Sequence, residues 1–430
     1  EKTLENHFRE DNSSYHVVSY DTITGEVMQK NTHQGYSDES AWARGQAWGL
    51  YGFTMVYRET GEARFLEQAR HIAGYILGHE NYPEDGVPYW DFNDPQLPDS
   101  PRDASAAAII CSALYELSLY VDSPEREVYF ASADRILKSL SGKKYETNQE
   151  DYNGFILDHS VGNLPKDDEI DVPMIYADYY FLEANLRRMK ITGNWKGKKA
   201  DVIIKADDLT FDNEEVVESR WQTFADLAVA YEIKVSPGIV GSSLERGNQA
   251  FFEWISEYRK TGLFEFWNHG QLHKRCEVNG VSTSEFLNID KEAQMDYIEQ
   301  TQNLAREKLG FDLVTFAAPY NWSDDKTALA LEEFPEIKVW LYKPVKLESS
   351  KITVMREAML NIEYPVHNAS FYHFLNSYYF YSNLDVIAIQ GHPHSWDEHR
   401  MKEFELFARY FNETGIKTIL PSELVVSIVE

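Results

Sequence analysis

Cysteine, basic residues and long apolar segments are all scarce in this sequence of 430 residues. The only cysteines, Cys111 and Cys276, argue against a disulfide framework and against a metal site built from thiolates. No apolar run approaches the roughly 20 residues of a membrane-spanning helix, so we expect a soluble protein with no membrane partner. The 41 basic residues are outnumbered by 70 acidic ones, and the resulting net charge of -29 opposes nucleic acid as a partner.

The composition nevertheless supports well-packed cores, because 43% of the residues are hydrophobic and 14% are aromatic. A chain of this length exceeds what one compact core normally supports, which favours two domains or one large toroid or barrel. The sequence opens on Glu1 rather than Met and has no signal-peptide pattern, so we expect that its true start is missing. The compartment therefore stays undecided between cytoplasm and periplasm.

The first part of the chain has the pattern of long helices in alternation. Segments that are apolar on most sides occupy residues 38 to 59, 102 to 120 and 171 to 190. Amphipathic segments occupy residues 60 to 80 and 123 to 142. Enclosed helices that alternate with amphipathic ones predict an all-α toroid of αα-hairpins, with the enclosed helices on its inner ring, over residues 1 to 195.

The pattern changes near residue 198, where strand-like runs begin to alternate with helical segments. We expect strands at residues 201 to 205, 228 to 235, 264 to 269, 313 to 320, 338 to 342, 385 to 392 and 417 to 421. Helices are expected at residues 245 to 260, 290 to 309 and 397 to 413. Strands separated by helices predict a parallel sheet closed into, or approaching, a (β/α) barrel over residues 199 to 430.

Polar residues follow three of these buried strands, at the ends where a barrel gathers its chemistry. They are Asp207, Asp208, His269, His273, His392 and His394. A carboxylate and two imidazoles that leave one coordination position open suit a catalytic divalent metal, with Zn²⁺ favoured by the nitrogen ligands. Each motif alone also has an ordinary structural explanation as a turn, a cap or a chance spacing.

These motifs resemble the polysaccharide deacetylases of carbohydrate esterase family 4, which have the NodB-like (β/α) barrel. The resemblance covers roughly residues 199 to 430. It implies that Asp207 is the general base, that His392 is the general acid, and that the metal ligands are Asp208, His269 and His273.

One position departs from this family. The segment Ala317-Ala318-Pro319-Tyr320 has Ala317 where the family has an arginine, so the group that orients the base is absent or supplied from elsewhere. We therefore expect a divergent deacetylase-like hydrolase, and the sequence leaves ester and N-acetyl substrates equally open. His394 is an alternative to His392, or an assistant to it.

The stretch HQGYSDESAWARGQAW, residues 33 to 48, places Trp42, Arg44 and Trp48 at the start of an expected inner helix. Indole rings stack on the apolar faces of sugars, and a guanidinium binds a carboxylate through two bonds. The ordinary alternative is that both Trp side chains belong to the core and that Arg44 forms a salt bridge.

Residues 13 to 190 look like the C-terminal half of the unsaturated glucuronyl hydrolases, glycoside hydrolase family 88. The resemblance rests on SSYHVVSYDTITGE, HQGYSDESAWARGQAWGLYGF, DGVPYWDF, PRDASAAAI and DVPMIYADYYFLEA. It implies an (α/α)6 toroid, here incomplete, that acts on oligosaccharides ending in an unsaturated uronic acid. It also implies that the substrate-binding positions are His16, Gln34, Trp42, Arg44 and Trp48.

The essential aspartate pair of that family lies upstream of the segment that matches residue 13. We therefore expect that this chain as given does not hydrolyse unsaturated glucuronides, since Asp38 and Asp103 are better explained as helix caps. The leading hypothesis is a carbohydrate-active hydrolase that joins a glycosidase-like module to a metal-dependent deacetylase-like module. The alternatives are a non-catalytic carbohydrate-binding protein and an accidental fusion of unrelated modules.

Overall fold

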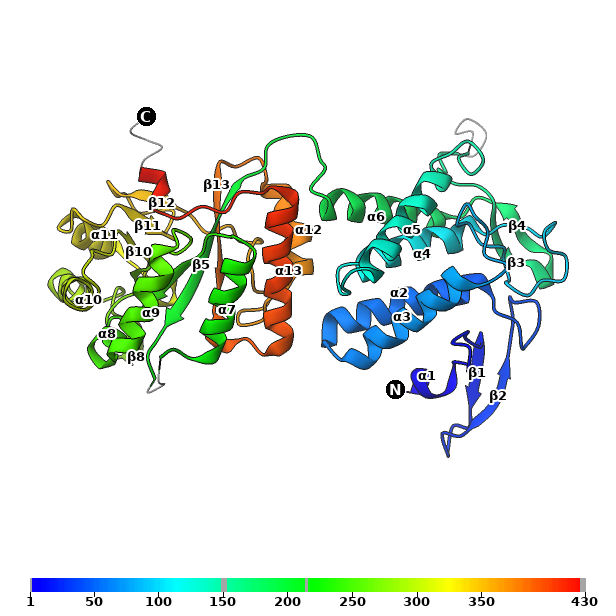
Figure 1. The fold of residues 1–430 in the computed structure, drawn as a ribbon, viewed down its shortest axis with the longest axis horizontal. Coiled ribbons are helices and arrows are strands. Elements are labelled where there is room, and N and C mark those ends of the chain that lie inside the picture. Colours follow the sequence, from blue (N-terminus) through cyan, green and yellow to red (C-terminus); the bar gives the residue numbers. More distant parts are fainter. Residues whose placement is uncertain (1, 148–152, 213–215, 426–430) are drawn as a thin grey trace. The chain divides into compact units, whose positions relative to one another are not determined.

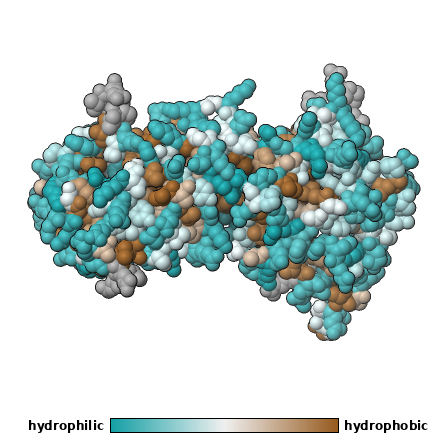
Figure 2. Space-filling view, in the orientation of Figure 1, coloured by the Kyte–Doolittle hydropathy of each residue, from teal (hydrophilic) through white to brown (hydrophobic). Residues whose placement is uncertain are grey.

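The computed structural model describes residues 2–147, 153–212 and 216–425. The chain divides into two compact units, Glu1–Ile191 and Thr192–Glu430, which are called unit 1 and unit 2 below (Figure 1). Hydrophilic side chains cover most of the visible face of each unit, as the strongly acidic composition leads one to expect (Figure 2). Within the described ranges, no helix is both long and apolar enough to cross a membrane.

Unit 1 consists of helices and two small antiparallel hairpins. Its helices are α1 Lys2–Asn6, α2 Ala43–Thr60, α3 Ala63–Gly78, α4 Ala104–Leu117, α5 Glu125–Leu140 and α6 Ile175–Ile191. The hairpins pair β1 Val17–Tyr20 with β2 Val27–Asn31, and β3 Ser160–Asn163 with β4 Asp168–Val172; the short 3-10 helix η1 Leu164–Lys166 joins the latter two strands. All five long segments that were expected to be helical are therefore helical, with boundaries shifted by a few residues.

Helix α4 is the centre of unit 1. Every one of its residues is buried, and it packs against α2, α5 and α6. Its first turn is capped by the Asp103 carboxylate, which accepts hydrogen bonds from the backbone N–H groups of Ser105 and Ala106. The expectation of an enclosed helix between residues 102 and 120 is confirmed, and so is the capping role of Asp103.

Helix α6 contradicts the expectation that residues 171 to 190 are enclosed. Ala177 and Ala184 are buried, whereas another side of the helix exposes four large apolar side chains. These four residues, called the α6 stripe below, are Ile175, Tyr179, Leu182 and Leu186, with exposed fractions of 71%, 59%, 49% and 48%. A helix with apolar residues on all its faces is compatible with burial, but it is buried only if other elements pack against each face.

Unit 2 contains a seven-stranded parallel sheet in the order β12-β11-β10-β7-β6-β5-β13. In chain order its strands are β5 Asp201–Leu209, β6 Ser236–Ile239, β7 Trp267–Asn268, β10 Thr315–Phe316, β11 Val339–Leu341, β12 Ile352–Val354 and β13 Val386–Gly391. An isolated parallel bridge between Arg356, just after β12, and Ala388 in β13 joins the two edges. The sheet is therefore nearly closed, as the expected (β/α) barrel requires.

Helices and short irregular elements connect the strands of unit 2 (Figure 1). The helices are α7 Ser219–Ala230, α8 Ser242–Arg246, α9 Gln249–Lys260, α10 Lys291–Leu309, α11 Asp325–Glu332, α12 Phe371–Tyr381 and α13 Glu398–Thr414. The remaining elements are the hairpin β8 Arg275–Val278 with β9 Val281–Ser284, and the 3-10 helices η2 Pro319–Asn321 and η3 Pro393–Ser395.

Two strand expectations need correction. Residues 228 to 230 end helix α7, whose buried side chains Trp221, Phe224, Ala225 and Ala228 recur at helical spacing, so the strand starts only at Ser236. Residues 417 to 421 contribute a single bridge, between Thr418 and Val202, rather than a full strand. Strand β12 and helix α12 were not expected.

Candidate active site

The two adjacent aspartates at the end of β5 reach the same site because the strand is irregular there. Successive side chains of a regular strand point to opposite faces. The pairing of β5 with β6 shifts register between Ala206 and Leu209, and Asp208 has a left-handed backbone with φ of 65°. As a result, His269 Nε2 lies 3.0 Å from Asp208 Oδ1 and 3.8 Å from Asp207 Oδ2.

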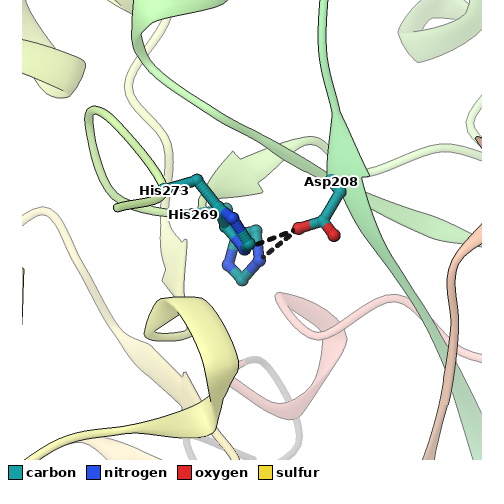
Figure 3. A group of neighbouring side chains, drawn as sticks. All are labelled: Asp208, His269 and His273. Carbon is teal, nitrogen blue, oxygen red and sulfur yellow. Dashed lines mark hydrogen bonds and ion pairs between the residues drawn. The ribbon is translucent and has the colours of Figure 1, made fainter. Parts of the chain in front are cut away.

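Asp208, His269 and His273, which the sequence analysis proposes as metal ligands, lie next to one another (Figure 3). Asp208 Oδ1 lies 3.0 Å from His269 Nε2 and 2.9 Å from His273 Nε2. His269 Nδ1 donates to the Ala317 carbonyl oxygen at 2.8 Å, so its Nε2 is the atom left for the site. The backbone of Ala317 thus orients a candidate metal ligand.

The donor set of this triad fits a divalent metal that accepts nitrogen ligands. Its three ligand atoms all lie within 4.8 Å of one another. Burial raises the pKa of Asp208, but the hydrogen bonds and charges of His269 and His273 outweigh burial and hold that pKa well below its ordinary value. Burial lowers the pKa of His273, yet Asp208 more than offsets this and raises it. One carboxylate facing two imidazoles matches the ligand types of catalytic Zn²⁺ sites, which keep one coordination position open.

The loop that carries His273 is held from two sides. The Glu285 carboxylate accepts a hydrogen bond from the His273 N–H at 3.1 Å, and burial raises the pKa of Glu285. The Tyr320 hydroxyl donates to the His273 carbonyl oxygen at 2.8 Å, while the two rings lie 4.4 Å apart. His273 is therefore fixed by residues of the neighbouring segments rather than by its own strand.

Asp207 lies in a closed ring of hydrogen bonds made by four side chains. The ammonium of Lys205 donates to both of its carboxylate oxygens, and Gln390 Nε2 donates to Oδ2 at 2.7 Å. Asn321 completes the ring, because its Nδ2 donates to Gln390 Oε1 at 3.1 Å and its Oδ1 accepts from Lys205 at 3.5 Å. Burial lowers the pKa of Lys205, and the Asp207 charge opposes that shift.

His392 lies close to Asp207 and is paired with Glu363. His392 Nδ1 is 2.8 Å from Glu363 Oε2, and its Nε2 is 3.3 Å from Gln390 Nε2, which also contacts Asp207. Burial lowers the pKa of His392, but Glu363, Asp207 and Asp208 outweigh it, so the pKa is raised. Burial lowers the pKa of His394. His392 thus has a buried carboxylate partner in Glu363, whereas burial dominates the environment of His394.

Five residues of this site were missed at the sequence level: Lys205, Glu285, Asn321, Glu363 and Gln390. Two of them leave a signal, because Lys205 interrupts the apolar run DVIIK and Gln390 interrupts DVIAIQ. A polar side chain in an otherwise apolar, buried strand needs a hydrogen-bond partner inside the protein. Glu285 and Glu363 lie in irregular segments and leave no comparable signal.

In unit 1, His16, Gln34 and Trp42 are brought together. His16 stacks on Trp42 with ring centroids 4.3 Å apart, and its Nδ1 accepts from the Gln34 N–H at 3.3 Å. Burial, together with the charges of His33 and Arg44, lowers the pKa of His16 to about 4. The Gln34 side chain donates to the Gly162 carbonyl oxygen at 2.7 Å, so its amide nitrogen is already engaged.

Arg44 follows the ordinary alternative considered for it. It is buried and lies 3.0 Å from the Asp103 carboxylate, and it also donates to Ser105 and to the carbonyl oxygens of Val161 and Gly162. Its donors therefore act within the protein, where they tie α2 to α4 and β3. The structure does not leave this guanidinium facing an open site.

A groove of about 620 Å³ lies beside α2 in unit 1. His16, Trp42 and Trp48 line it, together with apolar residues of α1 and α2. Trp48 is 39% exposed, whereas Trp42 is buried and its indole N–H has no hydrogen-bond partner among the described residues. Unlike Arg44, these three predicted residues share one accessible concave surface.

The N-terminal half of the chain is similar to known unsaturated glucuronyl hydrolases. It is 51% identical over 189 residues to that of Formosa agariphila and 41% identical over 193 residues to that of Bacillus sp. strain GL1. These matches cover 44% of this chain in both cases, and 46% and 50% of the relatives. The chain thus spans about half the length of the curated relatives it matches. No family model matches the chain.

Solved structures match the same share of the chain. An unsaturated glucuronyl hydrolase specific for heparin is 53% identical, with 45% of this chain and 51% of that chain covered and a TM-score of 0.44. A Streptococcus agalactiae unsaturated glucuronyl hydrolase complexed with dGlcA-GalNAc6S is 36% identical, with 43% and 48% covered and a TM-score of 0.38. The predicted similarity of this half to unsaturated glucuronyl hydrolases is confirmed by the sequence matches.

Proposed function

We propose that the protein is a carbohydrate-active hydrolase with two modules, in which unit 2 is a metal-dependent deacetylase of NodB-like type and unit 1 binds oligosaccharides that end in an unsaturated uronic acid. The observation that carries the proposal for unit 2 is the convergence of Asp208, His269 and His273 beside Asp207. For unit 1 the proposal rests on its similarity to unsaturated glucuronyl hydrolases.

The residues of unit 2 divide the work of removing an acetyl group. Asp208, His269 and His273 would hold the metal, for which Zn²⁺ is favoured. When bound, the metal supplies Lewis-acid chemistry toward an acetyl carbonyl. Asp207 takes a proton from the attacking water as general base, and His392 gives a proton to the departing sugar oxygen or nitrogen as general acid. Acetate and the deacetylated sugar are the products, which balances the added water.

The pair of His392 and Glu363 suits a general acid. Glu363 is buried and accepts hydrogen bonds from the His392 N–H and from Trp396 Nε1, besides its contact with His392 Nδ1. Burial raises the pKa of Glu363, but His392 outweighs it and lowers that pKa, so the carboxylate stays charged. This charge favours the protonated form of His392 and fixes its Nδ1 toward Glu363, with Nε2 beside Gln390.

Three features of the unit 1 groove support sugar binding there. Trp48 offers an exposed indole face, and His16 stays neutral near pH 7 because of its low pKa. The buried indole N–H of Trp42 has no hydrogen-bond partner among the residues that the structure describes. Acetyl groups on uronic-acid oligosaccharides hinder downstream cleavage, so deacetylation in unit 2 is a sensible companion to recognition in unit 1. The substrates of the two units would then be parts of one acidic glycan.

Acetate release tests the proposal for unit 2. The purified chain is loaded with Zn²⁺ and incubated with acetylated uronic-acid oligosaccharides and with N-acetylated ones, and acetate is measured. We expect release from one of the two classes and its loss in Asp208→Ala, with no loss in Asp325→Ala, a change at an exposed aspartate of α11. A chain that binds no metal and releases no acetate would support the non-catalytic carbohydrate-binding alternative.

Binding of an unsaturated uronic-acid disaccharide tests the proposal for unit 1. Titration calorimetry of the chain should show binding that weakens about fivefold in Trp48→Ala, because stacking on one aromatic ring is worth about 1 kcal/mol. Val128→Ala on the exposed face of α5 is the matched control. Equal affinities of the parent chain, Trp48→Ala and Val128→Ala would contradict sugar binding in the proposed groove. If unit 1 binds no disaccharide and unit 2 releases no acetate, an accidental fusion is favoured.

A further inference from the structure

The buried ammonium of Lys205 is the most unusual charge in unit 2. Its side chain has no exposed surface, and it lies within β5, two residues before Asp207. An isolated buried charge is costly, and even a buried ion pair seldom stabilises a fold better than well-packed apolar residues would. Stability alone is therefore a weak explanation for a lysine at this position.

The surroundings of Lys205 leave its ammonium one strong partner. The rings of Trp267 and Tyr342 lie on it with their centroids 5.0 Å away, and each ring is itself fixed by a hydrogen bond to the backbone. The contact with Asp207 involves both carboxylate oxygens, whereas the contact with Asn321 is 3.5 Å long. The two rings thus fix the position of the Lys205 ammonium, and its hydrogen bonds are directed at the Asp207 carboxylate.

From this arrangement we infer that Lys205 is the positioning residue of the general base, which holds the Asp207 carboxylate toward the reacting atoms in place of the arginine that is absent at Ala317. The inference rests on the proposed deacetylase function of unit 2. Ala317, just after β10, belongs to the same buried cluster as Trp267 and Tyr342, the two residues whose rings lie on Lys205.

The ring of hydrogen bonds explains why a single cation suffices. Gln390 holds Asp207 Oδ2 from β13, and Asn321 holds both Gln390 and Lys205 from η2. Rotation of the Asp207 carboxylate would break contacts to two different strands at once. A base fixed in this way meets the need of catalysis for reacting groups placed to within about 1 Å.

The test compares Lys205→Met with the parent chain and with Gln390→Ala, using the intact protein. We expect kcat for acetate release to fall about a hundredfold in Lys205→Met, with KM and Zn²⁺ affinity changed by less than threefold. Gln390→Ala keeps the Lys205 contact and should lose less. A crystal structure of Lys205→Met should show Asp207 rotated away from His269.

A merely structural role predicts something else. Metal affinity and thermal stability would then fall together with kcat, and KM would rise. This result overturns the inference, and so does a folded Lys205→Met with unchanged kcat. If Lys205→Met does not fold, we use the double variant Lys205→Ala with Ala317→Arg, in which the arginine at position 317 supplies the cation for Asp207. Recovery of kcat supports the inference, and a folded but inactive double variant contradicts it. A parent chain that binds Zn²⁺ but releases no acetate refutes the proposed function instead.

Discussion

Units 1 and 2 each bury a cation against an aspartate beside their candidate sites, but the two pairs differ in what surrounds them. Arg44 in unit 1 shares its donors among Asp103, a hydroxyl and two carbonyl oxygens, all of which belong to the scaffold. Lys205 in unit 2 is directed to Asp207, which lies 3.8 Å from a candidate metal ligand. A buried cation paired with an aspartate therefore joins parts of the scaffold in unit 1, whereas in unit 2 we propose that it orients the general base.

The largest effect that sharpens this contrast is expected from Arg44→Met. The change leaves the fully buried Asp103 carboxylate without its cation, which should cost unit 1 about 3–5 kcal/mol of stability. Hydrogen exchange of α4, followed by mass spectrometry, measures the loss, and acetate release by unit 2 should stay the same. Arg64→Met, at an exposed ion pair with Glu62, is the control and should cost less than about 0.5 kcal/mol. Unchanged exchange in α4 would show that the Arg44 pair is not structural.

A smaller effect is expected from Glu363→Gln, which tests the acid of unit 2 through pH. His392 has a raised pKa, so its protonated form persists above its ordinary value near 6.5, and kcat should fall as the pH rises through the raised pKa. Removal of the Glu363 charge should move this alkaline limb to lower pH by about one unit, a tenfold loss on the limb. Glu398→Gln, at an exposed residue of α13, should leave the profile in place. A limb that does not move would exclude His392 as the acid.

The smallest effect concerns the apolar surface that unit 1 leaves exposed on α6. The sheet of unit 2 nearly joins its own edges, whereas unit 1 leaves the α6 stripe exposed. Leu182→Gln removes one apolar side chain from the stripe and should change stability by less than about 0.5 kcal/mol. It should reduce concentration-dependent self-association, which sedimentation velocity measures, because exposed apolar patches promote contacts between molecules. Ala184→Gln, on the buried side of the same helix, should destabilise unit 1. Equal self-association of the parent and Leu182→Gln would show that the stripe attracts nothing.

The sequence predicts more of the site in unit 2 than of the site in unit 1, for a physical reason. Asp208, His269 and His273 lie at or just after the C-terminal ends of strands in one parallel sheet. These ends lie close together in a barrel-like sheet even when the exact strand boundaries are not known. Arg44 is different, because one sequence position is compatible with a ligand contact and with a salt bridge, and only the place of Asp103 decides between them. Fold class was predictable from periodicity, but the exposure of α6 depends on a missing neighbour, which periodicity does not report.

The left-handed backbone of Asp208 also restricts which sequences can occupy that position. With φ of 65°, most side chains clash with their own backbone, and glycine, asparagine and aspartate are the residues that adopt this conformation at low cost. Of these three, aspartate alone brings a negative charge to His269 and His273. Residue 208 is therefore constrained twice, first by the backbone conformation of the strand and then by the proposed chemistry of the site, and aspartate satisfies both constraints.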